Sequence, residues 1–181
     1  MKEFDAIIIG GGLSGSSTAL NLSKKGYSVL ILEKEALGNI KPCAGGMASS
    51  MKKFLPLDFD QAIESKIRNV EFRWKSSDNV VADLSGESPF WIIRREKLDK
   101  LLLDEALKYG SEILKPVQVE KIISQNNKYW IIKCSNKNIY KSKFLVIADG
   151  SQSQWTSYFN LGPRKPKFAN TIAVRLKGLG N

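Results

Sequence analysis

Residues 4–15 of the chain read FDAIIIGGGLSG, a largely apolar run that ends in closely spaced glycines. The run is typical of a parallel strand that is buried on both faces of its sheet. The residues after the glycines predict a helix over 13–25, and the run YSVLIL predicts a second strand that ends at Glu33. The glycines in G-x-G-x-x-G spacing are Gly10, Gly12 and Gly15.

Each glycine of this turn has a mechanical role. Gly10 permits the tight turn off the strand, Gly12 lets the backbone approach a diphosphate, and Gly15 lets the helix lie close to the sheet. The amides of Leu13 and Ser14 point outward at the start of the helix. Because that end of a helix carries a partial positive charge, the sequence predicts a diphosphate-binding turn.

Glu33 is the acid that this motif requires after the glycines. It closes the second predicted strand, where its carboxylate can accept both hydroxyls of an adenosine ribose and would repel a 2′-phosphate. A glycine-rich loop in an unrelated α/β fold is the alternative. The strand before the glycines, the helix after them and the position of Glu33 favour a dinucleotide site.

The chain then departs from the regular alternation of helix and strand. The further elements are expected as strands at 69–74, 80–84, 90–94, 117–123, 128–135 and 139–150, and as a helix at 96–110. The last three strands form an antiparallel meander, and its last strand should rejoin the parallel sheet as the buried run FLVIA. Since ligands bind at the carboxyl ends of parallel strands, Asp149 should face the same cofactor as Glu33. A cap of the following turn is the alternative role for Asp149.

With these features the chain resembles the N-terminal half of the FAD-dependent oxidoreductases of the aromatic-hydroxylase and geranylgeranyl-reductase superfamily. The further residues that carry the resemblance are Arg95 in R-E-K-L-D, and Asp149, Gly150 and Ser153 in D-G-x-x-S. The resemblance implies that Arg95 lies near FAD, although Arg94 could hold that role, or Arg95 could be a surface charge. It also implies that Asp149 and Gly150 lie near the phosphate and ribose, and that the backbone of Val119 touches the adenine.

Residues 42–46 read PCAGG, which is similar to the prenyl-reductase branch of this superfamily. The resemblance implies that Cys43, Gly45 and Gly46 form an active-site loop beside the flavin ring, where the two glycines let the backbone approach. Cys43 lacks the usual partner of a nucleophile, because the chain has no histidine. Cys43 therefore either shapes the pocket or is a packed loop cysteine.

The expected fold class is α/β, with a Rossmann-like parallel sheet, an antiparallel β-meander crossover and part of an inserted antiparallel substrate-domain sheet. The FAD-binding domain is expected at 1–50 and 95–160, and the partial substrate domain at 51–94 and 161–181. The resemblance covers only the N-terminal half of the family, so we expect a fragment with an incomplete flavin pocket.

The function that the resemblance implies is hydride transfer from reduced FAD to a carbon–carbon double bond of an isoprenoid, as in geranylgeranyl reductases. NAD(P)H or another reductant would supply the electrons. The first alternative is an FAD-dependent monooxygenase of the aromatic-hydroxylase type. The second is a non-catalytic remnant that binds nucleotide weakly.

The composition bounds the partners and the compartment. Two cysteines without histidine do not supply a structural zinc site and favour a reducing, cytoplasmic compartment. Acids near the N-terminus argue against a signal peptide. The net charge is +10, mostly from scattered lysines, which is not typical of nucleic-acid binding. The segment from residue 115 to residue 143 contains seven lysines and only one acidic residue. This segment is either an ordinary solvated surface or a peripheral contact with an anionic membrane.

Overall fold

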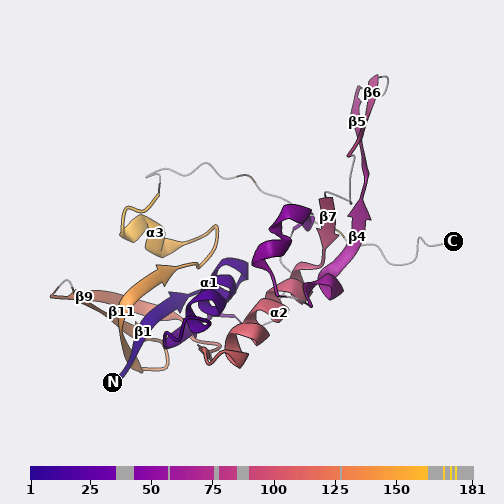
Figure 1. Ribbon diagram of the computed structural model, residues 1–181. Coiled ribbons are helices and arrows are strands. Elements are labelled where there is room, and N and C mark those ends of the chain that lie inside the picture. Colours follow the sequence, from indigo (N-terminus) through magenta and orange to yellow (C-terminus); the bar gives the residue numbers. More distant parts are fainter. Residues whose placement is uncertain are drawn as a thin grey trace. The chain divides into compact units, whose positions relative to one another are not determined.

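The first strand of the chain lies inside a six-stranded sheet of order β8-β2-β1-β11-β10-β9 (Figure 1). Its strands are β1 (Lys2–Ile9), β2 (Val29–Leu32), β8 (Glu112–Leu114), β9 (Val119–Gln125), β10 (Tyr129–Cys134) and β11 (Ile139–Ile147). β1 pairs in parallel with both β2 and β11, whereas β10 pairs antiparallel with β11 and with β9. The predicted fold class is therefore confirmed, including the meander whose last strand rejoins the parallel sheet.

The computed structural model describes residues 1–35, 43–56, 58–75, 78–84, 90–126, 128–162, 169, 172 and 174. The chain divides into two units, which are Met1–Asn39 with Asp99–Lys167, and Ile40–Leu98 with Phe168–Asn181. The six-stranded sheet belongs to the first unit. Pro42 of the predicted active-site loop lies outside the described residues.

The core of the first unit follows from the apolar runs of β1 and β2. Ile7, Ile8, Leu30 and Ile31 are all buried, with at most 1% of their surface exposed. Helix α1 (Leu13–Ser23) packs on both strands and buries Ala19 and Leu20. Burial of one such large side chain contributes about 1.5–3 kcal/mol, so these strands are the main source of stability for the sheet.

The prediction that the run FLVIA at the end of β11 is buried is wrong. Phe144 is 64% exposed, and the rest of the run is only half-buried. The facing residues Ile7 and Ile9 of β1 stay buried, so the exposure belongs to the end of β11. The physical reason is that one face of this strand end is not covered by the described residues.

The second unit is built from antiparallel strands. β3 (Gly46–Ala48), β7 (Phe90–Ile93) and β4 (Ile63–Ile67) form one sheet in the order β3-β7-β4, and β5 (Asn69–Trp74) pairs with β6 (Asp78–Asp83) as a hairpin. After β3 the chain forms two 3-10 turns, η1 (Ser49–Phe54) and η2 (Phe59–Ala62). Phe59 packs on Trp91 with the ring centroids 5.3 Å apart, and both side chains are buried.

Two further helices complete the described elements. α2 (Arg95–Lys108) ends before Gly110, whose φ of +91° is typical of a glycine after a helix. α3 (Gln154–Tyr158) is capped by Ser153, whose Oγ accepts the Thr156 amide at 3.0 Å. Within the described ranges, none of the helices has both the length and the apolar content to cross a bilayer.

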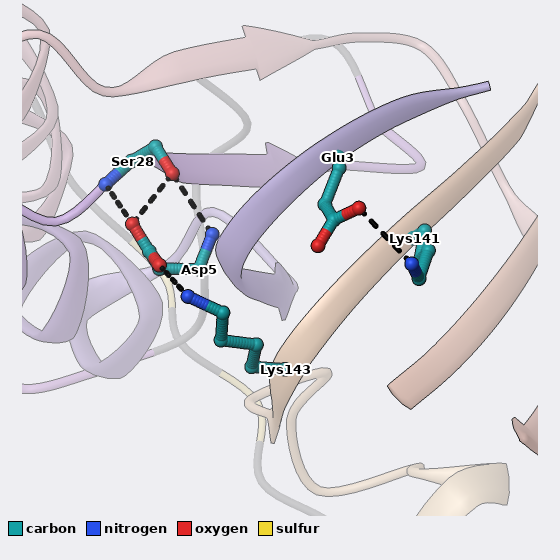
Figure 2. A network of polar contacts seen from close by, with 5 residues as sticks. All are labelled: Glu3, Asp5, Ser28, Lys141 and Lys143. Carbon is teal, nitrogen blue, oxygen red and sulfur yellow. Dashed lines mark hydrogen bonds and ion pairs between the residues drawn. The ribbon is translucent and has the colours of Figure 1, made fainter. Parts of the chain in front are cut away.

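A polar network connects the N-terminal half of β1 to its two neighbours, β2 and β11 (Figure 2). The Asp5 carboxylate accepts hydrogen bonds from the Ser28 amide at 3.0 Å, the Ser28 hydroxyl at 2.8 Å and Lys143 Nζ at 2.9 Å. Lys141 Nζ donates to Glu3 at 3.0 Å. The bond from Lys143, followed by those from Ser28, lowers the pKa of Asp5 to about 2.

Candidate functional site

Three segments of the chain meet at the carboxyl ends of β1, β2 and β11. The Gly10 amide donates to the Leu32 carbonyl at 2.9 Å, and the Ala148 amide donates to the Ile9 carbonyl at 2.8 Å. Gly10 has a φ of +102°, and a Cβ there would lie 2.3 Å from the Ala148 oxygen. A side chain would therefore collide with the backbone of the next strand, which explains glycine at the first position of the motif.

Glu33 lies directly against the glycine turn. Its Oε2 accepts the Gly11 amide at 2.6 Å and its Oε1 accepts the Glu35 amide at 2.9 Å, with 9% of the residue exposed. An ionised carboxylate has about four acceptor positions, so each oxygen keeps capacity for another donor. The structure thus brings the acid and the glycines to one place, as the motif requires.

The start of α1 is prepared for an anion. Gly12 is its N-cap in an extended conformation, no side chain caps the helix, and its first turn has no acidic residue. The amides of Leu13 and Ser14 belong to the first turn, where no intrahelical acceptor exists. A Cβ on Gly15 would lie 1.9 Å from the Gly10 oxygen, so the helix begins in contact with the turn.

Asp149 follows β11 and carries a buried acceptor without a partner. Among the described residues, its Oδ1 is inaccessible to solvent and accepts no hydrogen bond. Ser153 caps the following helix, so the alternative role of Asp149 as a cap lacks support. Leaving a buried carboxylate oxygen unpaired costs free energy, which a hydroxyl donor of a ligand would recover. The next residue, Gly150, is exposed and has a φ of +90°.

The start of β9 lies next to the acid as well. The Val117 amide donates to the Glu33 carbonyl at 2.8 Å. Val119 is buried and faces Cys134 at an irregularity of the β9–β10 ladder. Burial raises the pKa of the Cys134 thiol to about 11, with a smaller contribution from Glu120. The contact of Val119 with adenine stays a prediction.

The glycines of the PCAGG motif are required by strand pairing in the second unit. Gly45 has a φ of +76°, its carbonyl accepts the Ile93 amide at 2.9 Å, and a Cβ there would lie 2.1 Å from the Ile93 oxygen. A Cβ on Gly46 would lie 2.6 Å from the ring of Phe90. The sequence predicts a role for both glycines beside the flavin only, because β3 has three residues and is too short to show a period.

The other predicted residues of the second unit differ in their surroundings. Cys43 is exposed, and its Sγ accepts the Gly45 amide at 3.4 Å. Arg94 Nε donates to Glu64 at 2.9 Å, a pairing that raises the pKa of Arg94. Arg95 is half-buried at the first position of α2. Whether Arg95 or Arg94 lies near FAD stays a prediction.

The predicted site residues therefore fall into two groups. The first unit holds Gly10, Gly12, Leu13, Ser14, Gly15, Glu33, Val119, Asp149 and Gly150. The second unit holds Cys43, Gly45, Gly46 and Arg95. The hydrogen bond from the Gly11 amide to Glu33 was not predicted, although Gly11, the middle residue of the GGG run, is the one that the motif leaves unassigned.

Comparison with known proteins agrees with this arrangement. Residues 5–66 match the sequence profile of the family described as FAD dependent oxidoreductase. The match begins in β1 and ends in β4, so it includes the glycine turn, Glu33 and the PCAGG motif. This similarity supports the prediction of an FAD-dependent oxidoreductase.

Curated relatives match almost the whole chain. Protein FixC of Salmonella typhi is 28% identical over 186 residues, which cover 97% of this chain and 43% of FixC. The probable electron transfer flavoprotein-quinone oxidoreductase YgcN of Escherichia coli (strain K12) is 29% identical over 180 residues, with 96% and 42% covered. The chain thus spans about two fifths of the length of these relatives.

Solved structures share the fold. A geranylgeranyl bacteriochlorophyll reductase-like protein (Ta0516) from Thermoplasma acidophilum superposes with a TM-score of 0.72 at 23% identity, covering 83% of this chain and 40% of that one. The halogenase PltM in complex with phloroglucinol and FAD superposes with a TM-score of 0.71 at 24% identity, covering 87% and 36%. At these identities the likeness supports the fold alone.

Proposed function

We propose that this chain holds the adenosine diphosphate half of FAD in an FAD-dependent oxidoreductase. The observation that carries the proposal is the convergence of three features at one edge of the sheet. These are the uncapped start of α1, the Glu33 carboxylate against Gly11, and the unpaired Asp149 Oδ1. A helix start, a ribose acceptor and a second buried acceptor together fit an adenine dinucleotide.

Each group has a separate task in this proposal. The amides of Leu13 and Ser14 bind the diphosphate, because the start of α1 carries neither a capping side chain nor an acid. Glu33 accepts the ribose hydroxyls and repels a 2′-phosphate, which selects FAD over a phosphorylated nicotinamide cofactor at this position. Asp149 accepts a further hydroxyl of the cofactor through Oδ1.

For the reaction, we propose reduction of a carbon–carbon double bond in an isoprenoid. When bound and reduced, FAD would supply the hydride for this saturation, and a proton would complete it. NAD(P)H or another reductant would supply the two electrons that reduce FAD. The PCAGG motif, which is similar to the prenyl-reductase branch, supports this substrate class. The side chain of Cys43 is exposed beside the backbone of Gly45, where it can shape a substrate surface.

A second candidate is electron transfer to a quinone. The relative YgcN matches 96% of this chain and is described as a probable electron transfer flavoprotein-quinone oxidoreductase. This reaction requires the same FAD-binding residues and differs in the electron acceptor. The other two alternatives, an oxygen-dependent monooxygenase and a non-catalytic remnant, are distinguished by the experiment below.

The test begins with flavin retained by the purified protein, then follows its reoxidation. The protein should bind FAD in preference to FMN, because FMN lacks the adenosine that Glu33 would hold. After anaerobic reduction with dithionite, addition of a geranylgeranyl lipid should reoxidise the flavin and yield a saturated product. Reoxidation only by a quinone would support the second candidate, and hydroxylated product in air would support a monooxygenase. Failure to bind FAD would contradict the whole proposal.

A further inference from the structure

A basic surface covers the outer face of the β9–β10–β11 meander. Strand pairing places Lys121 directly opposite Lys133, and Lys133 directly opposite Ile139. Side chains alternate along a strand, so these residues share one face, opposite the face of the buried Ile122 and Ile132. We call Lys121, Ile123, Lys133 and Ile139, together with the turn lysines Lys128 and Lys137, the basic meander face.

The two opposed lysines lack internal compensation. Like charges directly opposite each other destabilise a sheet. Lys141 and Lys143 of β11 have acidic partners on β1, as Figure 2 shows, whereas no acidic side chain pairs with Lys121 or Lys133 in the part of the chain that the structure describes. Both lysines are exposed. The unbalanced charge of this face is therefore available to an external anion.

Apolar side chains lie between these lysines. Ile123 is 37% exposed and Ile139 is 40% exposed, although both belong to regular strands. A single exposed apolar residue is common on protein surfaces, but Ile123 and Ile139 lie on the same strand face as the lysines. Lysines mixed with apolar side chains are the composition of proteins that bind the surface of a membrane.

We propose that the basic meander face docks on an anionic lipid bilayer. Between residues 115 and 143 every basic residue is a lysine and none is an arginine. Lysine acts as a point charge, whereas recognition of a defined acidic group on a protein or nucleic acid favours the planar fork of arginine. A bilayer offers many mobile anionic headgroups, which suit point charges spread over a sheet. This proposal does not depend on which substrate the enzyme reduces.

The test is sedimentation of the full chain with lipid vesicles at low salt. Vesicles of phosphatidylcholine and phosphatidylglycerol in equal parts should bind the protein, and vesicles of phosphatidylcholine alone should not. The double variant Lys121→Gln with Lys133→Gln should lower the partition coefficient by roughly 30-fold, since each lysine near a membrane surface contributes about a fivefold factor. Added salt should weaken the binding.

The matched control is Lys52→Gln with Lys53→Gln, which removes the same charge from exposed residues of η1. Equal losses in both double variants, or no preference for anionic vesicles, would overturn the proposal. If the protein bound poly-glutamate but not vesicles, and the Lys121/Lys133 variant lost this binding, the basic meander face would bind an acidic protein and the proposal would be overturned. The Lys121/Lys133 variant should melt at or above the temperature of the wild type, because it removes a like-charge pair. A loss of vesicle binding is therefore not due to unfolding.

Discussion

Gly15 shows how one missing side chain positions the candidate site. A Cβ on this residue would lie 1.9 Å from the Gly10 oxygen and 3.3 Å from Ile8. The helix start can approach the turn only because this space is empty. The same spacing could be predicted from the sequence, since the motif assigns this task to its third glycine.

Replacing Gly15 with alanine should therefore lower both stability and cofactor affinity. We expect Gly15→Ala to reduce the free energy of unfolding by about 1–3 kcal/mol, because the new methyl forces the helix away from the turn. Urea unfolding monitored by circular dichroism measures this change. The control is Ser17→Ala in the same helix, which should stay within about 0.5 kcal/mol of the wild type. Equal stability of both variants would contradict the close contact.

We expect Asp149 to contribute to FAD binding without contributing to the stability of the ligand-free protein. Its buried Oδ1 has no hydrogen-bond partner in the part of the chain that the structure describes. Replacing the carboxylate with a neutral amide should therefore leave the ligand-free protein as stable or make it more stable. We expect Asp149→Asn to weaken FAD binding by about tenfold or more, as for loss of a hydrogen bond to a charged group. Thermal melts with and without FAD measure both effects.

The control for Asp149 is Asp60→Asn, an exposed residue of η2. It should change neither the ligand-free melting temperature nor the increase caused by FAD. If Asp149→Asn destabilised the ligand-free protein and left the FAD effect intact, Asp149 would be a structural residue.

At the scale of elements, the network around Asp5 fixes β1 between β2 and β11. Its pKa is lowered to about 2 by Lys143 first and Ser28 second. A lowered pKa in the folded state means that the ionised form stabilises the fold above the ordinary pKa of the carboxyl, near 4. This contribution is lost as the pH falls from about 4 through about 2.

Asp5→Asn should therefore lower the melting temperature at pH 7, with a difference from the wild type that shrinks as the pH falls toward 2. Thermal melts across this pH range measure the difference. Glu3→Gln is the matched control, because Glu3 has only the single bond from Lys141 at 3.0 Å and should have a smaller effect. A difference that is constant with pH would contradict the role of the Asp5 charge.

The elements differ in how far the sequence predicts them. Continuous apolar runs predicted β1 and β2, because strands buried on both faces are apolar throughout. Runs between short polar turns predicted the meander. β3 and β8 have three residues each and β4 is mostly polar, so their pairing depends on distant strands rather than on local pattern. At the end of β11 the apolar sequence predicted a buried strand, but these residues are exposed or only half-buried.

At the scale of the whole molecule, site residues that belong to one local motif could be predicted from the sequence more accurately than those that depend on distant strands. The glycines and Glu33 converge as the motif requires, whereas the roles of Gly45 and Gly46 in pairing with β7 depend on a strand more than 40 residues away. The pairing of Arg94 with Glu64 is also a tertiary contact without a local signal. Residues that serve a common turn are therefore predictable, and those that serve long-range packing are not.

The most direct test of the central claim is a titration of the protein with ADP, the part of FAD that Glu33 and the start of α1 would hold. We predict saturable binding that Glu33→Gln weakens by at least about tenfold, because a charge-assisted hydrogen bond contributes about 1.5–3 kcal/mol. ADP with a 2′-phosphate on the same ribose should bind more weakly than ADP to the wild type and lose this disadvantage in Glu33→Gln. Isothermal calorimetry gives all four affinities. Absence of ADP binding, or equal affinities of wild type and Glu33→Gln, would contradict the account.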